Sequence, residues 1–456
     1  MKKSVSLNIV SLILIISLFS IVNAQNNSKE TSKAEELLKK IDFSNYPTPL
    51  YTQYIDDANG KKLDSLITEA LQVNKELIAI RQKKNVFQGK RLQAGLRPNP
   101  HIEVEFLTDQ LSNRAGEYDF STTYLQPLER GGKREKRIRV VDLELAQLEK
   151  EIIFQEHKLR LDILTQYANA LASSQQLQLL ERIVRLNEEN FQLVQVKFKE
   201  GDVAKLDLQL TEIELNRWKI QQLQTELQVK AHFAQIKFLI GLELDIPLKL
   251  SSSFPIPNLT TLDILSLQNI ALENRADLQA ARIAEEIAQA RIDLAQSQAK
   301  PNIDLFAKYQ EERKVEEIGL GRFIDTQRKI GGGISFSLPI YNRNQGEILE
   351  TTASKTQASY LREQLEQKVK QEVAIAIVQV LNAQQTIKLF EINILPKVQD
   401  NLKILQVAYQ LGEEDLLSVI TEQRRFIESQ KEYVLAYKEY YLSLIALEKA
   451  IGTTIN

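Results

Sequence analysis

The sequence contains no cysteine, one methionine and only three histidines among its 456 residues. The lack of cysteine excludes disulfide bridges, thiolate metal ligands, cysteine nucleophiles and a lipid-modified cysteine. The three histidines, His101, His157 and His232, lie far apart, and none has a second histidine at helical spacing. We therefore expect packing or surface roles for them and no metal site.

Glycine and proline are also scarce, with 16 and 11 residues, which is roughly half of their average usage. Because these residues form most turns, their scarcity favours long uninterrupted helices over many short strands. Acidic and basic residues nearly balance, for a formal net charge of -2, and a chain without a basic excess is a poor partner for nucleic acid. The sequence also has no nucleophile–base arrangement and no phosphate loop, so we expect no enzymatic activity and no cofactor.

Only one apolar run approaches the length of a membrane span, and it lies at the N-terminus. Lys2 and Lys3 precede the run, which extends from Val5 to Val22, and the residues up to Ala24 match what a signal peptidase reads. An N-terminal transmembrane anchor is the alternative, but the run is short and contains polar residues. We predict an export signal cleaved after Ala24, so strands would have to make any later membrane crossing.

Two long segments predict helical hairpins. From Lys133 to Glu200 there is neither glycine nor proline, and apolar residues recur in heptads, which predicts one amphipathic helix of 68 residues and about 100 Å. Gly201 interrupts the pattern before a second helical segment that reaches Ile240. The design returns with a segment from Glu347 to Leu411, an interruption at Gly412 and a segment from Glu413 to Ile451. We predict hairpin tips near Gly201 and Gly412, and a kink or local defect at Pro396.

An internal repeat extends upstream of these hairpins. Several residues between positions 70 and 102 recur 201 positions later, among them Ala70-Leu71, Leu77, Ala79, Arg81, Pro100 and Ile102. The sequence therefore predicts a short segment at 25–60 and two repeats of about 200 residues, at 61–260 and 261–456. The first helix of the first repeat is expected to be continuous from Lys61 to Leu96.

Alternating segments lie between the first two helices of each repeat. Apolar residues, with one threonine, occupy every second position in four short stretches: Ile102, Val104 and Phe106; Phe120, Thr122 and Tyr124; Ile303, Leu305, Ala307 and Tyr309; and Ile334, Phe336 and Leu338. These stretches predict two β-hairpins, each with one apolar and one polar face. Two interpretations stay open: a half-buried sheet of a soluble protein, or a membrane barrel with lipid outside and water inside. Four strands cannot close a barrel, so the second interpretation requires several chains to pool their strands.

Four separated motifs resemble those of one known family. They are LRPNP at 96–100, QPL at 126–128, GGKR at 131–134 and LPIYNRNQG at 338–346. In this order they resemble the TolC-like outer-membrane efflux proteins, and most of all the CzcC/CusC-type branch that serves heavy-metal RND pumps. The resemblance covers roughly residues 61–452. One departure is Asn74-Lys75, where the family usually has Asn-Pro, at the start of a helix.

The resemblance implies a mainly α-helical fold with a small β part. It implies a homotrimer in the outer membrane of a Gram-negative bacterium, with twelve pooled strands closing one β-barrel within the membrane lipid. Twelve helices would continue this barrel as an α-helical barrel across the periplasm. The implied function is a passive exit duct for heavy-metal cations or drugs, with a periplasmic adaptor protein at the helical tips and an inner-membrane RND transporter as the energy source. The alternatives are the exit duct of a type I protein secretion system and an exported coiled-coil scaffold without a pore.

The resemblance also implies a gate at the hairpin tips. Asp207 and Tyr409 lie where related proteins place two residues that bond across neighbouring hairpins in the closed state, while Glu414 replaces the arginine of that network. Acidic side chains at Asp202, Glu413, Glu414 and Asp415 could line a cation-selecting ring. The alternatives are that Asp207 is a solvated helix residue and that Asp202 and Glu413 stabilise helix N-termini. A basic run at 130–139 is expected to form a collar between strand and helix or to contact anionic lipid.

Overall fold

The computed structural model describes residues 53–108, 116–201, 203–252, 263–318, 321–411 and 413–454. The chain divides into two compact units, one of Met1–Ile78, Phe154–Arg275 and Lys368–Asn456, and one of Ala79–Ile153 and Ala276–Gln367. Each unit draws on both of the repeats that the sequence predicts. The predicted export signal and its cleavage after Ala24 lie outside the described residues.

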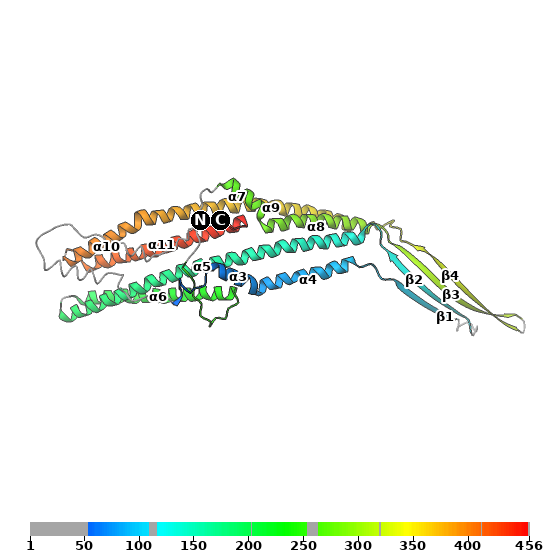
Figure 1. Cartoon of the computed structure of the whole chain (residues 1–456), viewed down its shortest axis with the longest axis horizontal. Coiled ribbons are helices and arrows are strands. Elements are labelled where there is room, and N and C mark those ends of the chain that lie inside the picture. Colours follow the sequence, from blue (N-terminus) through cyan, green and yellow to red (C-terminus); the bar gives the residue numbers. More distant parts are fainter. Residues whose placement is uncertain are drawn as a thin grey trace. The chain divides into compact units, whose positions relative to one another are not determined.

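Long helices dominate the fold, as the scarcity of glycine and proline predicts (Figure 1). Helix α5 spans Lys133–Glu200 and is a single helix of 68 residues, which confirms the sequence prediction. The remaining helices after the strands of each repeat are α6 (Lys205–Leu239), α9 (Gln345–Leu389), α10 (Leu395–Gln410) and α11 (Leu416–Ile451). Helix α11 ends at Gly452, whose φ of 78° is the left-handed conformation that glycine adopts most readily. Large side chains of the first unit, including Tyr167, Ile163, Ile236, Val369 and Val373, are fully buried between these helices.

The prediction of one continuous helix from Lys61 to Leu96 was wrong. The structure has two helices there, α3 (Leu63–Val73) and α4 (Lys75–Gly95), separated at Asn74 with φ -62° and ψ 121°. The Asn74 side chain accepts a hydrogen bond from the backbone N–H of Leu77 at 3.1 Å and donates to the carbonyl of Leu239 at 3.3 Å. Asparagine thus caps the new helix through its own side chain. The second repeat has the same break at Arg275, between α7 (Ile264–Asn274) and α8 (Ala276–Gln298).

The defect predicted at Pro396 is a π-helical turn. A five-residue π-helix, η4 (Phe390–Ile394), separates α9 from α10, and Pro396 lies in the first turn of α10. The backbone N–H of Leu395 donates to the carbonyl of Phe390, five residues back. Because proline has no N–H and its ring crowds the preceding turn, a wider turn before it relieves the conflict.

The four strands form one antiparallel sheet in the second unit. The strands are β1 (His101–Thr108), β2 (Tyr118–Leu128), β3 (Ile303–Ile318) and β4 (Gly321–Ser335), in the order β1-β2-β3-β4. The two predicted hairpins are therefore joined through β2 and β3, and the second hairpin is longer than the sequence indicates. Phe336 and Leu338 lie beyond the end of β4.

Pairing of the strands fixes which side chains share a face. Ile102, Val104 and Phe106 pair with Tyr124, Thr122 and Phe120, and these pair in turn with Ala307, Tyr309 and Glu311. Ile303 and Leu305 lie on the same face of β3, since side chains alternate along a strand. Glu103 and Glu105 lie on the opposite face, in rows with Lys308 and Gln310. The sheet therefore has one largely apolar face near its helical end and one polar face.

The basic run at 130–139 holds α5 against the ends of its neighbours. Arg134 Nε donates to the carbonyl of Gly95 at 2.5 Å, and Arg137 Nε donates to the carbonyl of Ala94 at 3.3 Å. Lys136 Nζ donates to the carbonyl of Asp293 at 2.7 Å. Ala94 and Gly95 are the last two residues of α4, where carbonyls have no partner within the helix and a cationic side chain satisfies them. The run thus forms a collar within the chain, which was one of its two expected roles.

Candidate functional site at the hairpin tips

The first tip lies between α5 and α6. Gly201 follows α5 with a φ of 88°, a left-handed conformation that favours glycine. A β-carbon at this position would meet no atom within 4 Å, so the backbone conformation, and not a lack of space, requires glycine here. Asp202 lies outside the described residues. Asp207 is half-buried in the first turn of α6, where its carboxylate accepts a hydrogen bond from the backbone N–H of Ala204 at 3.2 Å.

The second tip lies between α10 and α11, and Gly412 is outside the described residues. Glu413 and Glu414 are exposed, and the backbone N–H of Glu413 donates to the carbonyl of Ala408 at 2.9 Å, which closes the end of α10. Asp415 caps α11, since its side chain accepts a hydrogen bond from the backbone N–H of Ser418 at 2.8 Å. The side chain that caps α11 is therefore that of Asp415.

The structure does not join the two predicted gate residues. Asp207 and Tyr409 are both half-buried, but no hydrogen bond connects them within the part of the chain that the structure describes. The carboxylate of Asp207 instead serves the N-terminus of α6, where a negative charge also favours the helix dipole. Within a single chain, Asp207 therefore stabilises the N-terminus of α6.

A carboxylate and a guanidinium that the sequence did not single out connect the two hairpins. Glu214 on α6 and Arg424 on α11 form a bidentate ion pair, with Arg424 Nε 2.8 Å from one carboxylate oxygen and a second nitrogen bonded to the other. The Glu214 side chain is 8% exposed and the Arg424 side chain 40% exposed. The carboxylate of Glu214 raises the pKa of Arg424. Nothing in local sequence spacing reveals this pair, because its members are 210 positions apart.

A small apolar core supports this ion pair. Leu180, Ile183 and Val184 of α5 pack with Leu215 and Trp218 of α6 and with Ile427 of α11. Glu214 directly precedes Leu215 in sequence, so its carboxylate lies at the edge of this core. Apolar packing and the ion pair of Glu214 and Arg424 therefore couple the two hairpins within one chain. A second ion pair, between Arg160 of α5 and Glu448 of α11 at 3.0 Å, joins the same two hairpins.

A second polar connection lies within the second hairpin, between the π-turn and α11. Tyr433 and Tyr437 of α11 both donate hydrogen bonds to one carboxylate oxygen of Glu391 in η4, at 2.9 and 2.8 Å. Their rings meet edge to face at 5.0 Å. Burial raises the pKa of Tyr433, and the neighbouring Tyr437 and Glu391 raise it further, so this hydroxyl stays protonated as a donor. The connection fixes α10 to α11 next to the irregular turn.

The capping role of Asp415 leads to a pH prediction. Hydrogen bonding to Ser418 holds the pKa of Asp415 below its ordinary value, so the cap contributes stability above about pH 4 and loses it as the pH falls through the lowered value. We expect Asp415→Ala to increase hydrogen exchange in the first turn of α11 at neutral pH. The difference from the unmodified chain should shrink in acid. A difference that is the same at both pH values would contradict a charged cap.

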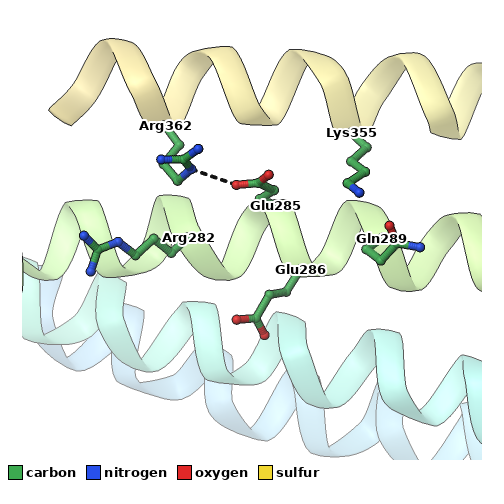
Figure 2. A pocket seen from close by; sticks show the side chains of 6 residues that line it. All are labelled: Arg282, Glu285, Glu286, Gln289, Lys355 and Arg362. Carbon is green, nitrogen blue, oxygen red and sulfur yellow. Dashed lines mark hydrogen bonds and ion pairs between the residues drawn. The ribbon is translucent and has the colours of Figure 1, made fainter. Parts of the chain in front are cut away.

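One charged pocket lies in the second unit, between α8 and α9 (Figure 2). It has a volume of about 430 Å³ and is lined by Arg282, Glu285, Glu286, Gln289, Lys355 and Arg362. Arg362 of α9 reaches Glu285 of α8 at 2.7 Å and Glu366 at 2.9 Å, whereas Glu286 points away from α9. Ion pairs across the two helices account for most of these charges, so the pocket belongs to a helix–helix contact.

Over the described ranges, no three His, Asp or Glu side chains lie close enough together to hold a metal ion. His157 is largely buried on α5, and burial lowers its pKa. His232 shares a hydrogen bond of 3.2 Å with Gln166, and His101 is exposed at the start of β1.

The sequence profile of outer membrane efflux proteins matches the chain in two segments, residues 66–242 and 267–453. The chain belongs to the outer membrane efflux protein family. The two matched segments each contain one helix–strand–helix series and one hairpin tip of the structure. The efflux-protein family thus accounts for the internal repeat and for the order of its elements.

Solved structures of other outer-membrane proteins share the fold of this efflux protein. CusC superposes with a TM-score of 0.71 at 19% identity, covering 90% of this chain and 96% of CusC. VceC of Vibrio cholerae superposes with a TM-score of 0.69 at 19% identity, covering 90% of this chain and 100% of VceC. At these identities the likeness concerns the fold, in which long helices continue from a four-stranded sheet.

A curated relative of this efflux protein is the alkaline protease secretion protein AprF of Pseudomonas aeruginosa. The two are 24% identical over 204 residues, which are 44% of this chain and 41% of AprF. The match therefore spans less than half of the length of either protein.

Proposed function

We propose that three copies of this chain form the outer-membrane exit duct of a tripartite efflux system. An inner-membrane RND transporter would supply the energy, and a periplasmic adaptor would bind the hairpin tips. The duct would conduct its substrate passively, and the proposed substrates are heavy-metal cations or drugs.

The four-stranded sheet carries this proposal. Its apolar face presents Ile102, Val104, Phe106, Ile330 and Ile334, which are all exposed. Its outer strands β1 and β4 pair with nothing further among the described residues. Open edges beside an apolar surface are unfavourable in lipid, where each unpaired backbone group is left without water. Joining β4 of one copy to β1 of the next removes both edges, and three copies supply twelve strands.

Exposed apolar stripes on the helices also support a second copy as partner. On α6, Leu206, Ile213, Ile220 and Leu227 are exposed at steps of seven. Along α9, η4 and α10, exposed residues include Ile375, Val378, Leu389, Ile392, Ile404 and Val407. Leu389 and Ile404 are fifteen positions apart, one more than two heptads. The π-turn between them contains one extra residue, which accounts for the difference. The π-turn thus keeps one stripe on one face, as packing on another helix requires.

The run Gln345–Tyr409 is long and apolar enough, by length and composition, to cross a bilayer. Its most apolar window is 33% buried. Heptad spacing of its exposed residues favours contact with another helix over contact with lipid on all sides. We therefore assign the membrane crossing to the strands.

The tips would form the gate and the adaptor site. In a trimer, Asp207 of one hairpin and Tyr409 of a neighbouring hairpin would converge, since each lies within about two helical turns of its tip. Glu413, Glu414 and Asp202 would add negative charge around the opening, where threefold symmetry multiplies it. Asp415 would contribute less, because its carboxylate is engaged with Ser418.

A double substitution tests the gate. We expect Asp207→Ala with Tyr409→Phe to raise the single-channel conductance of the reconstituted trimer, because a charge-assisted hydrogen bond that favours the closed state is lost. Asp207→Ala alone removes the α6 cap as well, so Asp207→Asn, which keeps a capping side chain, serves as the control for helix stability. Unchanged conductance of an intact trimer would assign both residues to helix structure alone.

Extraction and mass test the assembly. We expect the full-length chain to be extracted from membranes only with detergent, and to run at three times the protomer mass. A single chain outside the membrane would expose the backbone groups at both edges of its four-stranded sheet, together with its apolar face. A soluble monomer released from the periplasm would overturn the proposed duct.

The similarity to AprF favours a second candidate, the exit duct of a protein secretion system. The two candidates share the duct and differ in the pump. Deleting the gene distinguishes them, since loss of tolerance to metal ions or drugs supports the RND partner. Loss of a secreted protein with unchanged tolerance supports the secretion system.

A further inference from the structure

An open polar cavity lies where the sheet meets the helices. Its volume is about 680 Å³, and its lining includes Lys133, Lys300, Asn302, Ser335, Phe336 and Ser337. They come from the first residue of α5, the segment between α8 and β3, and the end of β4 with the residues after it. The whole cavity therefore lies within one compact unit.

The cavity contains a lysine that is unusually well covered. Lys133 is only 9% exposed, and its Nζ donates a hydrogen bond to the side-chain oxygen of Asn302 at 2.7 Å. Burial lowers the pKa of Lys133. An ammonium group has three donors, and Asn302 is a neutral acceptor. The carboxylate of Glu129 also acts on the charge of Lys133, but Glu129 is bonded to Arg137. A second cation, Lys300, lines the same cavity, against one carboxylate from Asp304.

Apolar side chains continue from the cavity along the chain. Phe336 lines it, and Leu338, Ile340 and Tyr341 follow with exposures of 69%, 60% and 91%. The apolar sheet face begins beside them, with Ile303, Leu305 and Ile334. An apolar body with a tyrosine at its border is typical of the boundary between acyl chains and head groups.

We propose that this cavity binds the phosphate of an anionic glycerophospholipid, with Lys133 and Lys300 at the phosphate and the segment at 336–341 against the acyl chains. Ser335 and Ser337 supply hydroxyl donors for the remaining phosphate oxygens. The adjoining apolar segment favours a lipid over free phosphate, because free phosphate has no acyl chain to cover that segment. The lipid is drawn from the leaflet on the helical side of the sheet, and this orientation rests on the proposed function.

Lipid retention by the intact detergent-purified assembly tests the site. The delipidated full-length protein is titrated with phosphatidylglycerol, and bound lipid is counted by native mass spectrometry. Lys300→Gln and Lys133→Gln are each expected to weaken binding about fivefold, the factor that one basic residue contributes at a lipid surface. Arg139→Gln is the matched control, since Arg139 belongs to the same basic run, is exposed and does not line the cavity. Lys300 is exposed, so its replacement should not disturb folding. Lys300→Gln therefore still tests the site if the buried Lys133→Gln fails to fold.

Selective loss in the two lysine variants, with Arg139→Gln unchanged, supports the site. Equal loss in all three variants overturns it, because binding would then reflect diffuse charge. Displacement of the lipid by an equal concentration of inorganic phosphate also overturns it, since that identifies a free-anion site. The mass of the complex is read in the same spectrum, so a failed trimer is distinguished from a failed lipid site.

Discussion

Replacing Val104 with arginine is expected to lower the free energy of unfolding in a lipid or micelle environment by about 2 to 4 kcal/mol. Val104 is exposed on the apolar face of β1, opposite Thr122, in the row that also contains Tyr309. A guanidinium at this depth must leave water or draw water into the lipid. Replacing the adjacent Glu103 with arginine should change the free energy little, since that side chain lies on the polar face.

Denaturant unfolding of the protein in micelles measures both variants against the unmodified chain. The pair is well matched, because both substitutions introduce the same side chain at neighbouring positions of one strand. Equal destabilisation at the two positions would contradict the assigned faces. Destabilisation by Glu103→Arg alone would mean that the faces are reversed.

Removing Arg424 is expected to destabilise the contact between α6 and α11 by about 2 to 3 kcal/mol. Arg424→Ala leaves the carboxylate of Glu214 mostly buried and without its bidentate partner. This loss of free energy is smaller than that for a fully buried pair, because the arginine is partly exposed. Arg217, at 3.5 Å from the same carboxylate, also keeps part of its charge compensated. Hydrogen exchange resolves this opening, since amides of α6 and α11 report local stability.

Two further variants make the expectation specific. Glu214→Leu combined with Arg424→Leu should recover most of the loss, because apolar side chains can replace a buried ion pair without leaving a charge. Lys219→Ala removes an exposed partner of Glu188 at 2.7 Å and should change stability by less than about 0.5 kcal/mol. A double variant as unstable as Arg424→Ala would show that the loss is one of packing.

Local patterns in the sequence predicted the long elements well. The heptad spacing and the lack of glycine from Lys133 to Glu200 specify α5 to the residue, and the proline at 396 marks the π-turn. The break at Asn74 was missed because its cause, a side chain that bonds Leu77 and Leu239, includes a distant partner. The extent of β3 and β4 was underestimated because charged residues such as Glu311 and Arg328 interrupt the alternation, whereas in the sheet they pair across strands at 3.0 Å.

The tips were harder to predict than the helices. Sequence spacing placed Asp207 and Tyr409 near the tips but could not show which atoms they contact. Asp415 could have been identified as a cap, because an aspartate directly before the apolar Leu416 and Leu417 is a frequent start of a helix. The pair of Glu214 and Arg424 could not, because only tertiary packing brings residues 210 positions apart into contact.

Cysteine cross-linking between the sheet edges tests the trimeric duct most directly, and the absence of native cysteine leaves no competing thiol. Glu105→Cys on β1 is combined in turn with single cysteines at successive positions of β4 from Phe323 to Gly333. Two strands separate β1 from β4 within one chain, about 14 Å of sheet, so a disulfide cannot form inside the protomer. The proposed assembly predicts that at least one pairing gives a covalent product at three times the protomer mass. A product that stops at two protomers, or no product along the whole of β4, would contradict it.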